Sequence, residues 1–371
     1  MTVRPELELG LDDTELELEL DDRRGVARQP RRSRSRWGWQ KLAALGALAA
    51  VLLLAAAWLR CGPWHEAEPR PGAAAASAQQ GQAAEEPFPS RFPAPDRLVA
   101  VGDLHGDLAA ARMALRIAGV LGDSDHWSGG HTVLVQTGDV LDRGDGEREV
   151  LDLLDRLADE AKAAGGAVRL LNGNHELMNA DGDLRYVSPH GFAEFMDLTG
   201  LELARPEIGV LPFEERPRAA AFRPGGPYAR KLSAHAIALV VGDTVFVHGG
   251  LLRKHVRQGL ERLNQESRDW LLGRSARGRE LVTSRDSPVW DRTFGLGTAL
   301  DCAALQDMLA EVGAARLVVG HSIQDAGISQ ACDRRVWRID VGMGSVHGAL
   351  PEALEVSAGD VRVLRATPAG E

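Results

Sequence analysis

The alternation of apolar and polar residues predicts strands and helices that follow one another through the C-terminal part of the chain. Short apolar runs typical of buried strands occupy residues 97–102, 132–136 and 168–171. Residues 108–118 form a helical pattern between the first two runs. A second helix is predicted by apolar residues spaced i, i+3, i+4 and i+7, namely Val150, Leu153, Leu154, Leu157 and Ala161. This order is typical of an α/β fold.

The pattern continues with further strands. Apolar runs predict strands at 237–248, 316–320 and 336–341. A C-terminal hairpin is predicted over 353–356 and 361–364, turned by Ala358, Gly359 and Asp360. The predicted class is therefore α/β, ending in antiparallel strands.

The N-terminal part has a different pattern, with a charge-free run of eighteen residues from Leu42 to Leu59. A helix of this length covers about 27 Å, and tryptophans lie near both of its ends, as in membrane spans. Seven arginines lie between residues 23 and 36, so the positive-inside rule places the N-terminus in the cytoplasm and everything after Arg60 on the periplasmic or extracellular side. A buried globular helix and a cleaved signal peptide are the alternatives.

We therefore expect four regions. They are a disordered charged tail (1–36), a transmembrane helix (37–60), a Pro/Ala-rich linker (61–95) and one folded domain (96–371). The folded region holds 40 acidic and 31 basic residues, hence nearly all of the formal charge of −10. Such an acidic balance argues against a nucleic-acid partner, because proteins that bind nucleic acid usually have a basic face.

Cysteine usage adds little. Cys61, Cys302 and Cys332 lie far apart and form no CxxC pair. We therefore expect neither a zinc ribbon nor a disulfide framework.

Polar clusters follow five of the predicted strands. Three are GDLHG from Gly102, GDVLDRG from Gly138 and GNHE from Gly173, and two more are VHGG from Val247 and VGH from Val319. Because the carboxyl ends of neighbouring parallel strands open on one crevice, we expect these loops to meet. An aspartate such as Asp103 is, taken singly, more often a helix N-cap, but capping does not explain four histidines within such motifs.

Aspartate, histidine and asparagine together in glycine-lined turns favour a pair of divalent cations with nitrogen and oxygen ligands. Cysteine is absent from every cluster, which argues against a closed structural zinc site. The pattern therefore predicts a reactive metal centre, and the native metal stays open among Mn, Fe and Zn, with Mn expected to serve in vitro.

At these motifs the chain resembles the metallophosphoesterases, and among them the phosphoprotein phosphatases, with their GDxHG, GDxxDRG and GNHE signatures and two later histidines. The stretches 179–187 (NADGDLRYV) and 288–292 (PVWDR) make it most similar to the bacterial-type, Shewanella-like branch. The resemblance implies a β-sandwich flanked by helices and the hydrolysis of phosphomonoesters, with a phosphorylated protein or a small phosphoester as substrate.

The resemblance also implies roles for individual residues. Its metal ligands would be Asp103 and His105 for the first ion, Asp139 as the bridge, and Asn174, His248 and His321 for the second ion. A hydroxide between the ions would be the nucleophile. His175, oriented by Asp142, would protonate the leaving oxygen. Arg143 would hold the phosphoryl oxygens, helped by Arg292, with Arg285 as the competitor for that second role.

Two features depart from the family or stay open. The loop tyrosine of the eukaryotic members has no counterpart, since the only tyrosines are Tyr186 and Tyr228. The proline-rich segment 201–230 is unlike a regular element and is expected to form a lid or substrate wall. Histidines outside the motifs, among them His235 and His347, are assigned no role.

Two alternative functions remain at this point. One is a hydrolase of dinucleoside polyphosphates, although few aromatic residues lie near the motifs to hold an adenine. The other is a membrane-tethered, non-catalytic binding protein, against which the intact ligand set argues. Oligomeric state is left open.

Overall fold

The computed structural model describes residues 88–366. The predicted charged tail, the predicted transmembrane helix at 37–60 and most of the predicted linker lie outside this range. Among the described residues, no helix combines the length and apolar character needed to span a bilayer.

Two β-sheets form the centre of the described region. The five-stranded sheet has the order β11 (Asp360–Arg365), β10 (Glu352–Ser357), β2 (Arg97–Val101), β3 (Val133–Gln136) and β4 (Ala167–Leu170). The six-stranded sheet has the order β1 (Arg91–Phe92), β5 (Ala238–Val241), β6 (Thr244–Val247), β7 (Arg316–Val319), β9 (Val336–Arg338) and β8 (Ser329–Ala331). The α/β class with stacked sheets and flanking helices is confirmed.

Each sheet contains three adjacent parallel strands. They are β2, β3 and β4 in one sheet, and β6, β7 and β9 in the other. The carboxyl ends of parallel strands lie at one edge of a sheet, so the polar loops that follow them are brought together there.

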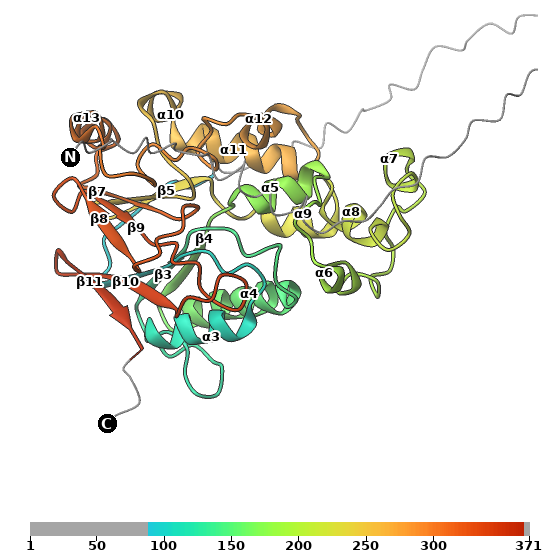
Figure 1. The fold of residues 1–371 in the computed structure, drawn as a ribbon, viewed down its shortest axis with the longest axis horizontal. Helices are drawn as coiled ribbons and strands as arrows, with labels where there is room; N and C mark the ends of the chain where they lie inside the picture. Colours follow the sequence, from blue (N-terminus) through green and yellow to red (C-terminus); the bar gives the residue numbers. More distant parts are fainter. Residues whose placement is uncertain (1–87, 367–371) are drawn as a thin grey trace, which may run out of the picture. The chain divides into compact units, whose positions relative to one another are not determined.

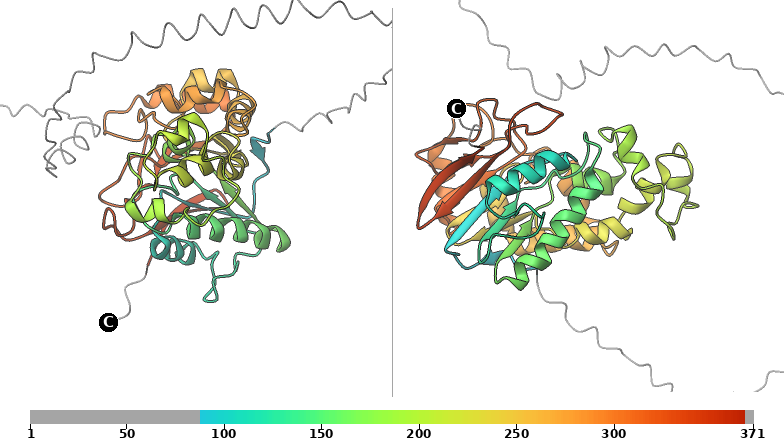
Figure 2. Two further views of the ribbon diagram at one scale, coloured as in Figure 1. Left: turned by 90° about the vertical axis from the view of Figure 1, so that its right-hand side faces the viewer. Right: turned by 90° about the horizontal axis from the view of Figure 1, so that it is seen from below.

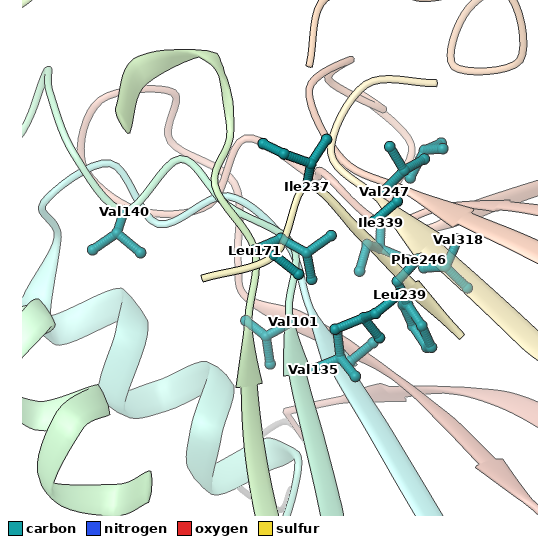
Figure 3. Packing of buried hydrophobic residues seen from close by; sticks show 14 of the residues in the cluster. Val101, Val135, Val140, Leu171, Ile237, Leu239, Phe246, Val247, Val318 and Ile339 are labelled. Atoms are coloured by element: carbon teal, nitrogen blue, oxygen red, sulfur yellow. The ribbon is translucent and has the colours of Figure 1, made fainter. Parts of the chain in front are cut away.

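The core lies between the sheets and is built from β-branched and other apolar side chains. Figure 3 shows Val101, Val135 and Leu171 from the first sheet facing Leu239 and Phe246 from the second. All five are at most 2% exposed. Burial of this apolar surface is the main force that holds the two sheets together.

Helices cover the outer faces of the sheets (Figures 1 and 2). On the five-stranded side lie α3 (Leu108–Ile117) and α4 (Glu147–Ala163), and on the other side α10 (Arg253–Gln258), α11 (Leu260–Leu271) and α13 (Cys302–Val312). In α4 the predicted apolar stripe, which includes Val150, Leu154 and Leu157, is buried. The helix begins three residues before the predicted stripe and ends two residues beyond it.

The prediction that 201–230 is irregular is wrong. This part of the chain contains α7 (Pro206–Gly209), α8 (Arg216–Phe222) and α9 (Pro227–Leu232), each with a proline in its first turn. A proline is accommodated there because the first amides of a helix have no partner within the helix. These helices and α6 (Pro189–Ala193) lie within residues 183–232, which we call the cap segment. In Figure 1 the cap segment extends away from the sheets, with α7 at its outer end.

Three further short helices lie outside the cap segment. They are α5 (Asn174–Asp181), the 3-10 helix η1 (Arg277–Arg279) and α12 (Glu280–Thr283). The single strand predicted at 237–248 is in fact the β5–β6 hairpin, because Gly242 (φ 59°) turns the chain between Val241 and Thr244. The predicted C-terminal hairpin is confirmed as β10 and β11, with Ala358 and Gly359 in the turn.

The cysteine spacing predicts no disulfide framework, but one disulfide is present. Cys302, at the start of α13, is bonded to Cys332 in the turn between β8 and β9, with their Cα atoms 5.3 Å apart. Sequence spacing could not show this, because the two cysteines are 30 positions apart and the chain between them forms β7 before it returns to α13.

Candidate metal centre

The five polar clusters meet at the carboxyl edge of the strands. Asp103 follows β2, Asp139 follows β3, and Asn174 and His175 begin α5 directly after β4. From the second sheet come His248 after β6 and His321 after β7. Together with His105, which also follows β2, the residues of this group are at most 8% exposed. The structure thus brings all six predicted ligands into one buried site.

Asp139 lies at the centre of this group. Its Oδ2 atom is 3.2 Å from Nε2 of His248 and 3.8 Å from Nε2 of both His105 and His175. Two sets of potential ligand atoms share this aspartate, each set within 4.8 Å: His105, Asp139 and His175 in one, and Asp139, His248 and His321 in the other. A carboxylate shared in this way suits a bridge between two ions.

The histidine rings are oriented as metal ligands usually are. His105 donates from Nδ1 to the carbonyl of Leu141 (3.0 Å), and His248 donates from Nδ1 to that of Thr137 (2.9 Å). Each bond leaves Nε2 of the ring facing the site, where it can bind a metal ion. Nε2 of His321 is buried and has no hydrogen-bond partner among the described residues. An orphaned buried nitrogen is rare unless an ion or water occupies the site, so the donor set fits divalent cations.

The charges of the site also fit cations. Burial and the neighbouring carboxylate of Asp340 raise the pKa of Asp103 well above its usual value. Burial would raise the pKa of Asp139 as well, but the charges of His248 and His175 outweigh it and hold that pKa well below its usual value. Asp340, which follows β9, is itself buried, and burial raises its pKa to about 6. Three carboxylates so close together are stabilised by positive charge.

The backbone at the site adopts a conformation that most residues avoid. Five non-glycine residues of the motifs have positive φ angles between 44° and 71°: His105, Asp139, Asp142, Arg143 and His321. Each such residue costs about 1 kcal/mol or more, and such residues cluster at functional sites. The loops are therefore shaped to direct these side chains inward.

Two glycines are required by close approach of the ligands. A Cβ atom at Gly173 would lie 2.1 Å from Oδ1 of Asp139, and one at Gly320 would lie 2.4 Å from Oδ1 of Asp103. The motif glycines thus leave room for the carboxylates as well as shaping the turns.

His175 and Asp142 form a buried pair beside Asp139. His175 donates from Nδ1 to Oδ2 of Asp142 at 2.7 Å, and both side chains are at most 2% exposed. Behind them, Glu176 accepts hydrogen bonds from the backbone amides of Gly173, Asp139, Val140 and Leu141 at 2.7 to 3.1 Å. Glu176 thereby ties the GDVLDRG loop to the start of α5.

Arg143 lies at the exposed side of the site. Its guanidinium is 5.5 Å from the ring centroid of Tyr186, and its Nη1 atom is 2.9 Å from Nε2 of His347. The pKa of His321 is lowered by burial, by the charge of His248 and by that of Arg292. Arg285 is exposed in the segment after α12.

Three residues of the site were not identified from the sequence. The ring of Tyr186 lies 5.1 Å from that of His175, and the ring of His347 lies 6.1 Å from that of His105. Asp340 is the third. The sequence pattern places Asp340 inside the strand predicted at 336–341, but β9 ends at Arg338, so Asp340 follows the strand as other ligands do, whereas His347 lies in a loop without a motif.

Residues 96–325 match the family model described as calcineurin-like phosphoesterase. The chain belongs to this family. It is a hydrolase that acts on phosphoric esters, and its His/Asp clusters are those of a metal-binding enzyme.

Relatives refine this assignment. The chain is 43% identical over 314 residues to Shewanella-like protein phosphatase 2 of Arabidopsis thaliana, covering 75% of this chain and 80% of the relative. It is 28% identical to Shewanella-like protein phosphatase 1 of Plasmodium berghei (strain Anka), over 67% of each chain. The chain is thus a homologue of the Shewanella-like protein phosphatases.

A solved structure shares the fold. The cold-active protein-tyrosine phosphatase of a psychrophilic Shewanella species superposes with a TM-score of 0.58 at 24% identity, covering 75% of this chain and 82% of that one. At this identity the likeness concerns the arrangement of the sheets and helices alone.

Proposed function

We propose that this metallophosphoesterase is a phosphoprotein phosphatase that uses two divalent cations. The observation that carries the proposal is the shared position of Asp139 between two ligand sets, with the His175–Asp142 pair beside it. The 43% identity to a relative named as a protein phosphatase supports the choice of substrate class.

The residues divide into those that hold the ions and those that act on the substrate. Asp103, His105 and Asp139 would hold one ion, and Asp139, Asn174, His248 and His321 the other. When bound, such a pair of cations lowers the pKa of a bound water and neutralises charge on the phosphoryl group. Mn, Fe and Zn all suit this mixture of nitrogen and oxygen ligands, and Mn is our choice for assays in vitro.

His175 acts on the leaving group. Its Nδ1 is held by Asp142, so Nε2 faces the site and can deliver a proton to the alkoxide or phenoxide oxygen as the P–O bond breaks. The pKa of His175 is raised despite burial, since Asp139 and Asp142 favour the protonated ring. A histidine whose pKa is raised in this way holds its proton more firmly than a free imidazole, which suits a general acid.

Arg143 would bind the phosphoryl oxygens. Its guanidinium, only partly exposed, lies beside the ring of Tyr186 and beside His347. A planar guanidinium holds two oxygens of one phosphate, which an ammonium does poorly. Arg292, whose charge lowers the pKa of His321, is our choice for a second contact.

Asp139→Asn tests the proposal. With Mn²⁺, the wild-type chain should hydrolyse an aryl phosphate and a phosphopeptide, and Asp139→Asn should abolish both activities by weakening both metal sites. Exposed Asp123 offers a matched control, and Asp123→Asn should leave turnover unchanged. Full turnover in Asp139→Asn would disprove the two-metal mechanism. Faster cleavage of a dinucleoside polyphosphate than of any phosphopeptide would assign the enzyme to nucleotides instead.

We further propose that residues 42–59 anchor the enzyme in a membrane, with the catalytic domain on the non-cytoplasmic side. The apolar run and the arginines before it support the anchor. The Cys302–Cys332 bond is compatible with that side, because disulfides persist in oxidising compartments. A reporter that works only in the cytoplasm can be fused after residue 371. Activity of this reporter would refute the topology.

A further inference from the structure

One arginine is completely buried behind the catalytic pair. Arg218 lies in α8 of the cap segment, and its side chain is 0% exposed. A buried guanidinium is costly unless each of its charged and polar contacts is satisfied. The contacts of Arg218 therefore indicate the role of this side chain.

The guanidinium makes four hydrogen bonds. Nε donates to Oδ1 of Asn179 (2.8 Å) and Nη1 to the carbonyl of Gly191 (3.0 Å). Nη2 donates to both Oδ1 of Asp142 (3.1 Å) and Oε2 of Glu147 (2.5 Å). Both Glu147 and Asp142 accept from Nη2, so the contact with Asp142 joins the arginine directly to the carboxylate that holds His175.

These bonds fix the carboxylate of Asp142. Oδ2 accepts the bond from His175, while Oδ1 accepts one bond from Nδ2 of Asn179 (2.8 Å) and one from Arg218. Asn179 in turn also donates to the carbonyl of His175. Both carboxylate oxygens are held, so the plane that directs the His175 ring has little freedom to rotate.

We propose that Arg218 is a positioning residue that holds Asp142, and through it the His175 ring, in line with the leaving oxygen. The inference rests on the proposed role of His175. It also gives the cap segment a part in catalysis, because α8 contributes a side chain to the network behind the reacting groups although it lies outside every signature motif.

Arg218 also contributes to packing, and the test must separate the two effects. Its guanidinium carbon is 5.1 Å from the ring centroids of both Phe195 and Phe222. A purely structural role predicts lower stability with equal loss of rate on every substrate. A positioning role predicts a loss that depends on how much the leaving group needs a proton.

The experiment compares Arg218→Met, Arg218→Lys and the control Arg216→Met in the Mn²⁺-loaded full chain. Arg216 is in the same helix but donates from Nε to the carbonyl of Leu211, away from Asp142. On aryl phosphates of increasing leaving-group pKa, Arg218→Met should lower kcat little for the best leaving group and about tenfold or more for the poorest, with KM unchanged.

Arg218→Lys should show the same trend at smaller size, because lysine keeps the charge but cannot make all four bonds. If Arg218→Met does not fold, the trend measured for Arg218→Lys tests the positioning role instead. Arg216→Met should match wild type. Equal loss on all substrates, a change in KM alone, or no change would overturn the inference.

A second measurement does not depend on activity. The ring N–H proton of His175 that bonds Asp142 is assigned by its loss in His175→Ala, and its proton NMR signal should shift or broaden in Arg218→Lys but not in Arg216→Met. An unmoved signal would overturn the inference. If the wild-type chain cleaved no phosphoester, the proposed function would fail, while this signal would still decide whether Arg218 positions His175.

Discussion

The two ring nitrogens of His175 have different neighbours, and this predicts what its removal does. Nδ1 donates a hydrogen bond to Oδ2 of Asp142, and Nε2 lies 3.8 Å from Oδ2 of Asp139. We expect His175→Ala to keep two bound metals and to lower kcat by about 10²- to 10⁴-fold, most for poor leaving groups, because the proton donor is lost. Metal content of the purified protein and kinetics on an aryl phosphate series measure both.

Loss of a metal ion in His175→Ala would contradict this assignment. His105, Asp139 and His175 are close enough to hold one ion between them, so the outcome distinguishes an acid from a ligand.

Gly320 allows a second prediction at the level of one residue. In Gly320→Ala the added Cβ would lie 2.4 Å from Oδ1 of Asp103 and 3.0 Å from Oγ1 of Thr137. Asp103 must then move, and we expect Mn²⁺ affinity, measured by titration, to fall about 10- to 100-fold. In the control Gly209→Ala the new Cβ has open space, and affinity should not change. Equal affinity in the two variants would remove Asp103 from the ligand set.

The motif residues of the site were predictable because signature and topology agree. Asp103, Asp139 and His321 each follow a predicted strand, and parallel strands bring such positions together. Tyr186 and His347 were not predictable, because each approaches the site from a loop whose path depends on packing. Arg218 was missed as well, because it lies in α8, within the segment that was predicted to be irregular.

Among the elements, strands with strong apolar runs were predicted within one or two residues. Regions β2, β3 and β7 are examples, while β1 and β8 have two and three residues and give no periodic signal. In the cap segment the prolines indicated irregular chain, yet Pro206 and Pro227 begin helices. Proline signals a boundary, and sequence alone does not say on which side of it the helix lies.

The disulfide joins two elements and allows a prediction at that scale. Cys302 starts α13 and Cys332 lies between β8 and β9, so the bond closes a loop that contains β7 and the ligand His321. Closing a loop of this length stabilises a protein by about 3 to 4 kcal/mol in the chain-entropy view. We expect a reductant to lower the Tm of the wild-type chain by several degrees.

The double variant Cys302→Ser, Cys332→Ser is the control for this effect. It should melt at the lower temperature with or without reductant. If reductant lowered its Tm as much as that of the wild type, the effect would not come from this bond.

At the scale of the whole molecule, the site exists only because two sheets pack together. Asp103, Asp139 and Asn174 come from the loops of one sheet, and His248 and His321 from those of the other. Periodicity identifies strands but not which sheet they join, so the stacking was expected only from the family resemblance. Residues such as Leu171 and Phe246, buried between the sheets, therefore support the metal centre without touching it.

The stability of the whole domain should depend on pH through His235, which precedes β5. Burial lowers the pKa of this histidine from 6.5 to about 4. The folded state therefore holds the ring neutral where the unfolded state binds a proton. The free energy of unfolding should fall as the pH drops below about 6.5, by up to about 3 kcal/mol near pH 4, and the fall from this group should stop below that pH.

Urea denaturation of the metal-free protein at pH 7 and pH 5 measures the effect. In His235→Gln the loss of stability between these pH values should be smaller by about 2 kcal/mol than in the wild type, because no proton is taken up at this position on unfolding. Exposed His131 provides the matched control, and His131→Gln should keep the wild-type slope. Equal slopes in wild type and His235→Gln would mean that water reaches the His235 ring in the folded state and lets it titrate normally.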